Sequence, residues 1–483
     1  MVDYEDSSQL NKWIFSTNQL EQCRAEANMR ARVWLTEQEQ LKQALKKDNA
    51  KIAADAAPSS GDTSRSTSPI PPSSLSSSPS SPAMAVSHFA CDYNNNNNQK
   101  DKIQEEESPK DFQVEGPWKT KKGHEFLTPQ EEATLISFYA SKLGTLIGPK
   151  ASVSRLRRES KVTATAALLY RRFYLSNSVM LFDPKAVVVA AAFLAAKVED
   201  AMADVRYLQE GTERMQAPVP QQEIIDAELS LLQGVDYDLL CFHPYKAVLA
   251  LTEDLRTFLK SEKGQTLVLQ HQRPISGQDL KPIYDKAREI LEQIIIYSSD
   301  LTLLFSPGPI GLASLIVAQE EILEQADKEE GATNAPPPKI DFHGYVQQRF
   351  PEQQQAQQAS SSSLLQTLPD LCQRVKALLT YAAEQKRNSA DTMVQLKQIH
   401  KKLKKVRAWG ASSSSEGAKK SKKKKKNKEE VTDGNTTTKS VLNDNSPPTP
   451  TSSNKRNDPS TVNNDDDDAV MAPPSKRVKT EPA

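Results

Sequence analysis

Cysteine and glycine are scarce in this sequence of 483 residues, and neither falls into a recognisable motif. The four cysteines, at positions 23, 91, 241 and 372, lie far apart and form no CxxC pair. This spacing argues against a zinc ribbon or a disulfide framework and indicates a reducing compartment. With only 16 glycines, the chain is poorly supplied with the loops that cradle phosphate groups. The six histidines have no metal-ligand spacing, so we expect no metal site and no cofactor.

Enzyme motifs are also missing. The sequence contains no GxxxxGKS or GxxxxGKT, no GxGxxG, no HExxH and no GxSxG pattern. We therefore predict that the chain has no catalytic residues and no enzymatic activity of its own. Its first residues, MVDYEDSSQLNKW, lack the basic and apolar regions of a signal peptide, and its apolar run 186–196 is much shorter than a membrane span of about 20 residues. We expect an intracellular soluble protein without membrane contact.

Two long stretches are too polar to bury a core. Residues 47–122 are rich in serine, proline and asparagine. Residues 410–483 contain the basic run KKSKKKKKNK at 419–428 and the acidic run DDDD at 465–468, although the formal net charge of the whole chain is +0. We predict a disordered linker over 47–122 and a disordered charged tail over 410–483.

The remaining segments have helical periodicity, and none alternates as a strand does. Thr128-Pro129 and Asp183-Pro184 each combine a capping residue with proline, which is a typical start of a helix. Further helices are predicted over 160–175, 221–235, 363–386 and 390–408, with another beginning at 243. The sequence therefore predicts an all-α fold.

The N-terminal segment predicts one helix over 16–46. Ser16 and Gln19 can form a capping box at its start. Trp13 and Phe15 precede it as aromatic residues in a polar context, and we expect them to anchor this helix to the rest of the protein.

The run AVVVAAAFLAA at 186–196 contains eleven apolar residues and is followed by Lys197, Glu199 and Asp200. A surface helix would carry polar residues on one face, so this pattern predicts a helix enclosed by other helices. Two interpretations of its charged end remain open. The first is an ordinary final turn, where a lysine meets the helix dipole favourably; the second is a lysine that a rigid helix presents to a partner.

The segment that begins at Tyr174 is echoed by the segment that begins at Tyr297. In both, a proline lies ten residues after the tyrosine and opens an apolar helix rich in small residues. This repeated pattern predicts a duplication of helical units. At the same offset, the position that matches Lys197 is Glu320.

Together these features resemble the cyclin family. The stretch AAFLAAKVED at 191–200 resembles the end of the third helix of a cyclin box, and SSQLNKWIFSTNQLEQCRAEANMRAR at 7–32 is similar to the N-terminal helix of the H-type cyclins. The resemblance covers roughly 5–45 and 124–408. It implies two tandem five-helix cyclin boxes, with extra helices before and after them. The domains expected are an N-terminal helix (1–46), a first box (123–241), a second box (242–386) and a C-terminal helix (387–409).

The resemblance also implies a function and a binding site. Cyclins bind a cyclin-dependent kinase and hold its mobile C-helix and activation segment in the active arrangement. Lys197 and Glu228 match the lysine and glutamate with which the family binds the kinase. Glu199 and Asp200 are further candidates at this surface, although their order, Glu-Asp, is the reverse of the Asp-Glu of the H type. The expected partners are a kinase of the kinase-activating type, a RING-finger assembly subunit and the core of transcription factor TFIIH.

The charged tail contains candidate signals for import and modification. Basic clusters at Lys422, Lys423, Lys424, Lys425 and Lys426 and at Lys476 and Arg477 are typical of nuclear import, so we expect a nuclear protein. Lys479 lies in VKTE, which fits the pattern of a SUMO acceptor, and Ser446 and Thr449 each precede a proline as in sites of proline-directed kinases.

Two alternatives stay open at this point. One is another transcriptional cyclin, of the C, K or L type, against which the segment around Trp13 argues. The other is a nucleic-acid-binding factor of the TFIIB kind, which shares the architecture. That reading needs basic residues spread over the folded repeats, and residues 221–232 are acidic, so we expect no direct binding of nucleic acid by the folded core.

Overall fold

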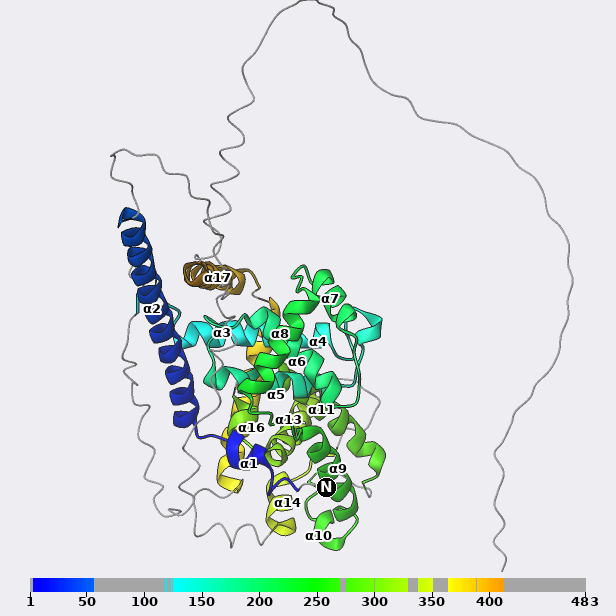
Figure 1. Cartoon of the computed structure of the whole chain (residues 1–483). Coiled ribbons are helices and arrows are strands. Elements are labelled where there is room, and N and C mark those ends of the chain that lie inside the picture. The colour runs from blue at the N-terminus through cyan, green and yellow to red at the C-terminus, as the bar shows by residue number, and fades with distance from the viewer. Residues whose placement is uncertain are drawn as a thin grey trace, which may run out of the picture. The chain divides into compact units, whose positions relative to one another are not determined.

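The computed structural model describes residues 3–55, 118–119, 123, 125–269, 275–298, 300–328, 338–350, 364–387 and 389–411. Within these ranges the chain is built of helices (Figure 1), and its only β-type pairing consists of two isolated bridges, Lys119 to Glu125 and Val268 to Ile340. The predicted all-α fold is confirmed.

The N-terminal segment forms two helices where the sequence predicted one. α1 spans Ser8–Trp13, and α2 spans Thr17–Asp55. Ser16 and Gln19 make the predicted capping box, in which Ser16 N donates to Gln19 Oε1 at 2.9 Å and Gln19 N donates to Ser16 Oγ at 3.3 Å. α2 therefore begins where the sequence placed it, but it continues nine residues past the predicted end at 46. It packs against α5 and α3 of the first half.

The first half contains six α-helices around a single core. They are α3 (Pro129–Ala140), α4 (Leu143–Leu146), α5 (Ser160–Ser176), α6 (Pro184–Val198), α7 (Val205–Arg214) and α8 (Gln221–Gly234), with a short 3₁₀ helix at Ser154–Leu156. α6 begins as predicted, because Asp183 caps the backbone N–H of Lys185 and Pro184 occupies the first turn. It packs against α3, α4, α5, α7 and α8.

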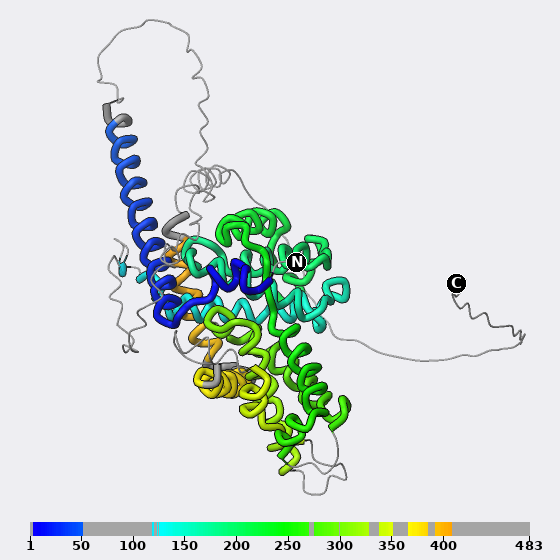
Figure 2. Tube along the Cα trace, turned by 90° about the horizontal axis from the view of Figure 1, so that it is seen from below, coloured from blue at the N-terminus to red at the C-terminus, as the bar shows by residue number. Residues whose placement is uncertain are grey.

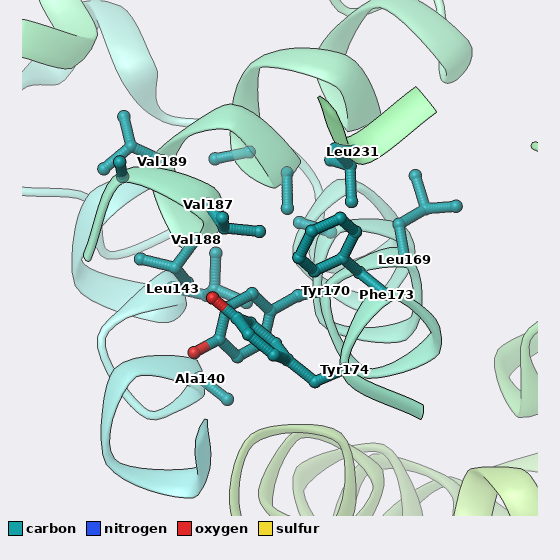
Figure 3. Close-up of a cluster of buried hydrophobic side chains, with 14 of the residues drawn as sticks. Ala140, Leu143, Leu169, Tyr170, Phe173, Tyr174, Val187, Val188, Val189 and Leu231 are labelled. Atoms are coloured by element: carbon teal, nitrogen blue, oxygen red, sulfur yellow. The ribbon is translucent and has the colours of Figure 1, made fainter. Parts of the chain in front are cut away.

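The enclosure of α6 follows from its small side chains. All residues from 186 to 196 are buried except Phe193, which confirms the predicted enclosed helix. Alanine and valine let the axes of neighbouring helices come close, while α5 supplies the aromatic bulk of the core. Figure 3 shows this packing, with Ala140, Leu143, Leu169, Tyr170, Phe173, Tyr174, Val187, Val188, Val189 and Leu231 in one cluster.

The second half has its own core and repeats the arrangement. Its helices are α9 (Pro244–Phe258), α10 (Glu262–Gln265), α11 (Gly277–Tyr297), α12 (Leu301–Leu304), α13 (Pro307–Lys328), α14 (Phe342–Arg349) and α16 (Leu364–Arg387). α13 begins at Pro307 as α6 begins at Pro184, and it packs against α9, α11 and α16. The final helix, α17 (Ser389–Ala411), packs back on α3 and α2. One face of α17 is buried in the core of the first half through Leu396, Ile399, Leu403 and Val406.

A buried acid lies where α2 meets α3. Glu132 is 5% exposed and accepts a hydrogen bond from Ser178 Oγ at 2.5 Å. On α2, the buried Asn28 donates to the carbonyl of Leu127, and the guanidinium of Arg32 is also fully buried. Burial raises the pKa of Glu132 to about 8, and the Ser178 hydrogen bond and the charge of Arg32 oppose this rise.

Stability should therefore fall as the pH rises through the neutral range. Glu132 binds its proton more tightly in the folded state, so its contribution is fully present below the ordinary carboxyl pKa of about 4.5 and is lost as the pH approaches about 8. In Glu132→Gln the side chain stays neutral, so its free energy of unfolding should decline less over this window than that of the wild type. Urea unfolding followed by circular dichroism checks this, and parallel pH profiles for the two proteins would contradict it.

Candidate protein-binding surface

Lys197 and Glu228 form an ion pair at the edge of the first half. Lys197 lies in the last turn of α6, and its Nζ is 2.8 Å and 2.9 Å from the two carboxylate oxygens of Glu228 on α8. The Lys197 side chain is 38% exposed, whereas that of Glu228 is only 12% exposed. The enclosed part of α6 thus holds a cation at the surface, and α8 holds an acid beside it that is largely shielded from solvent.

Apolar side chains surround this pair. Lys197 Nζ lies 4.0 Å from the centre of the Phe193 ring, one turn earlier on α6. On α8, Ile225 lies one turn before Glu228 and Leu229 directly follows it, and these two apolar side chains are 44% and 53% exposed. Exposed apolar residues gathered at one place on a surface mark a candidate protein-binding site.

Asp200 ends the helix that carries Lys197. Its φ of 51° lies in the left-handed region, and the next residue, Ala201, donates its N–H to Ala196 O at 2.8 Å. Asp200 N donates to Lys197 O at 3.3 Å, which completes a Schellman motif. Asp200 is exposed, and its observed contribution is to stop α6 directly after Lys197.

Glu199 turns away from the Lys197–Glu228 pair. Its Oε1 accepts a hydrogen bond from Thr165 Oγ1 at 2.5 Å and lies 3.9 Å from His243 Nε2 on α9, while Lys161 Nζ is 3.7 Å from Oε2. The nearby His243 ring and the hydroxyl of Thr165 hold the pKa of Glu199 below its ordinary value, against the opposing effect of partial burial. The structure therefore brings Lys197 and Glu228 together and directs Glu199 to the junction between the two halves.

Trp13 lies between the two halves of the protein. Its side chain is fully buried against Leu168 of α5 and Leu303 of α12, and its Nε1 donates to Asp238 Oδ2 at 2.8 Å. The guanidinium of Arg172 lies 4.9 Å from the centre of its ring. In Figure 2 the α1 segment, in dark blue, crosses the junction of the two halves.

Phe15 is held mainly through its backbone. Its N–H donates to Leu303 O at 2.8 Å, and its ring is half-buried. Trp13 and Phe15 thus both attach the N-terminal segment to the helical halves of the same chain.

Comparison with known proteins identifies the fold that carries these residues. Residues 151–240 match the family described as cyclin, N-terminal domain. This range contains α5 to α8, and therefore both members of the Lys197–Glu228 pair. This part of the chain is therefore similar to the N-terminal domain of cyclins.

Similar proteins come from several eukaryotes. The chain is similar to cyclin CCL1 of Saccharomyces cerevisiae, with 28% identity over 197 residues that cover 41% of this chain and 44% of the relative. It is also similar to cyclin-H1-1 of Arabidopsis thaliana, with 26% identity over 192 residues that cover 40% and 50% of the two chains. The matched regions thus span about half the length of these relatives.

A solved structure is similar to this chain in fold. It is a chain from the structure titled the CAK complex of Chaetomium thermophilum bound to ATP-gamma-S. The similarity covers 90% of this chain and 100% of that chain, with a TM-score of 0.50 and 20% identity. At this identity the agreement concerns the fold.

The second half of the chain repeats the ion pair with the charges exchanged. Glu320, which the sequence echo aligns with Lys197, lies on α13, and its Oε2 is 2.8 Å from Lys376 Nζ on α16. The two side chains are 40% and 52% exposed. Positions 197 and 320, which match in the sequence echo, therefore each carry a charged residue that pairs with an opposite charge on another helix of the same half.

Several predicted features involve other parts of the chain. The candidates for import and modification, Lys422 to Lys426, Ser446, Thr449, Lys476, Arg477 and Lys479, lie outside the described residues. Among the described residues, no group of three or more His, Cys, Asp and Glu could hold a metal ion. No helix in that part of the chain is long and apolar enough to cross a bilayer.

A cleft of about 1060 Å³ lies at the junction of the two halves, beside Glu199 and His243. Its lining residues come from segments near residues 4, 149, 157, 240 and 288, which are far apart in the sequence. No local sequence motif could therefore have predicted the cleft.

Proposed function

We propose that this chain is the regulatory cyclin subunit that binds and activates a cyclin-dependent kinase. The observation that carries this proposal is the Lys197–Glu228 pair, formed between the last turn of the enclosed α6 and the middle of α8, with the exposed Ile225 and Leu229 nearby on α8. The resemblance noted from the sequence assigns the kinase contact to these two residues.

The geometry of the pair suits contact with a polypeptide backbone. An ammonium group has three donors, and two of them point to Glu228 at 2.8 Å and 2.9 Å. One donor is left for a backbone carbonyl of the partner, and the carboxylate keeps lone pairs for a partner N–H. Because α6 is packed on all sides, the pair is in position before the kinase arrives, and little entropy is lost on binding.

The chain would act by shaping the kinase and not by chemistry of its own. A cyclin seated against the mobile C-helix of the kinase binds only the active arrangement, so it shifts the equilibrium of the kinase towards that state. The catalytic groups and the nucleotide would then belong to the kinase.

We further propose that the chain is an H-type cyclin working in the nucleus. Supporting this are the relatives named cyclin-H1-1 and putative cyclin-H, the fold shared with a chain of a CAK complex, and the N-terminal segment that docks through Trp13. The partners on this proposal are a kinase-activating kinase, a RING-finger assembly subunit and the TFIIH core.

Affinity purification of the tagged full chain from nuclear extract, followed by mass spectrometry, tests this function. We expect a cyclin-dependent kinase in near-stoichiometric amount, together with a RING-finger protein, and protein kinase activity in the eluate. The chain purified alone should have no kinase activity. Recovery of nucleic acid without a kinase would instead support the TFIIB-like alternative and contradict the proposal.

A further inference from the structure

The cleft between the two halves is rich in positive charge. Five basic and two acidic side chains line it. Two of the basic groups are already engaged: Arg158 donates to the carbonyls of Ala201 and Met202, and Lys161 lies 3.7 Å from Glu199. The other three are Arg157, Lys246 and Arg288, which are exposed and form no ion pair with another described residue. They are available to an anionic ligand.

Three helices begin at the same cleft. The first residues of α5 and α13 and the N-cap of α9 are among its lining residues, and these helices contain 17, 22 and 15 residues. Glu159 and His243, at the N-caps of α5 and α9, make no side-chain capping bond. The positive ends of three helix dipoles therefore add to the charge of the basic side chains.

Aromatic rings form another part of the lining. Tyr4 and Phe242 pack edge to face with ring centres 5.3 Å apart, and Tyr245 lies in the first turn of α9. Aromatic-lined grooves bind proline-rich segments, which are already extended before they dock. The ligand that fits both features has an anionic group next to an extended apolar segment.

We propose that this cleft binds a segment of another protein in which a phosphoserine or phosphothreonine is followed by proline. The phosphate carries a charge of about −1.5 to −2 and three acceptor oxygens, which would be held by Lys246, Arg288 and Arg157. The proline and its neighbours would lie against Phe242 and Tyr245. This site is distinct from the Lys197–Glu228 surface and does not depend on the proposed kinase.

The charge distribution favours a single phosphate over a nucleic acid. Arg288 is followed on α11 by Glu289 and Glu292, and Asp285 precedes it. Glu292 accepts a hydrogen bond from Ser160, which lines the cleft. Acids therefore border the basic side chains, and the successive phosphates of a nucleic-acid strand would meet them. A strand also needs basic residues along a continuous groove.

Fluorescence anisotropy with the full chain tests the proposal. The probes are a labelled dodecapeptide with one phosphoserine-proline in a neutral sequence, the same peptide without phosphate, and an oligouridine of equal length. We expect removal of the phosphate to weaken peptide binding by about tenfold or more. The double variant Lys246→Gln with Arg288→Gln should weaken binding of the phosphopeptide to a similar extent.

Lys260→Gln serves as the matched control, because Lys260 is an exposed lysine just beyond the other end of α9. It should bind the phosphopeptide as the wild type does. The lysine-rich run 419–428 attracts any polyanion, so the deciding quantity is the difference between variants. Equal binding of the two peptides, or an unchanged affinity in the double variant, would overturn the proposal. An oligouridine affinity that falls more than the phosphopeptide affinity in the double variant would replace it with a nucleic-acid site.

Discussion

Lys197→Ala is expected to weaken binding of the kinase by about 30-fold or more. Truncating one partner of a desolvated charge pair in an interface costs about 2–5 kcal/mol, and each 1.4 kcal/mol is about a tenfold change in affinity. Much of this cost arises because Glu228, whose side chain is only 12% exposed, would be left without its cation. Titration of the purified kinase by isothermal calorimetry measures the effect.

The second half of the chain provides a matched control for this prediction. Glu320→Ala breaks an ion pair of the same length, 2.8 Å, at the corresponding position of α13. If Lys197 acts at the kinase surface, Glu320→Ala should leave the affinity for the kinase within about threefold, and both variants should keep the helical circular dichroism of the wild type.

A charge exchange separates contact with the kinase from a purely internal role. Lys197→Glu combined with Glu228→Lys restores an ion pair within the chain but offers the kinase opposite charges at each position. We expect this double variant to bind at least as weakly as Lys197→Ala, because a carboxylate would then face the partner's backbone carbonyl and an ammonium would face its N–H, so that each of these groups loses its hydrogen bond. Recovery of wild-type affinity would show that the pair only supports the fold, and would contradict the proposed contact.

The enclosed helix could be predicted because its signal is local. Asp183-Pro184 specifies where α6 starts, and the eleven apolar residues 186–196 indicate that the helix is buried. Lys197 is the first charged residue after this run. The caps at Asp183 and at Ser16 depend on neighbours within four residues in the chain, and both are present. Fold class follows from such local patterns repeated along the sequence.

The contacts between helices could not be predicted from the residues alone. Lys197 and Glu228 are separated by 31 positions, and their pairing was inferred only through resemblance. The orientation of the Glu199 side chain depends on the left-handed backbone of Asp200 and on the position of Thr165, whose hydroxyl donates to it. In the sequence, Glu199 and Asp200 are simply two adjacent acidic residues, and no local pattern predicts that their side chains have different surroundings.

The burial of charge was also beyond sequence reasoning. Glu132 belongs to an ordinary acidic first turn, yet it becomes buried because α2 covers it after a separation of about 100 positions. The basic cleft likewise requires both halves and the N-terminal segment to be in place. Patterns in a single sequence indicate the local conformation that a residue favours. The burial of Glu132 and the lining of the cleft depend instead on tertiary contacts with segments that are distant in the sequence.

Trp13→Ala is expected to be the most destabilising of the substitutions considered. Removing a fully buried tryptophan costs about 3–5 kcal/mol, as lost transfer free energy plus the cavity left behind. The variant would also leave Asp238 without the indole donor and Arg172 without the ring beside it. Urea unfolding should show a correspondingly lower free energy, and trypsin should cleave after Lys12 faster, because α1 no longer holds to the junction.

Two further variants show whether this loss comes from packing at Trp13. Trp13→Phe keeps an aromatic ring but loses the hydrogen bond to Asp238, so its cost should be smaller, about 2 kcal/mol. Leu41→Ala changes a side chain of α2 that is 55% exposed and should alter the free energy by no more than about 0.5 kcal/mol. If Trp13→Ala unfolded like the wild type and resisted trypsin equally, the docking of α1 would contribute nothing to stability. The free energy of unfolding should therefore rise in the order alanine, phenylalanine, tryptophan at position 13. Of these three side chains, the indole alone can both pack against α5 and α12 and donate a hydrogen bond to Asp238.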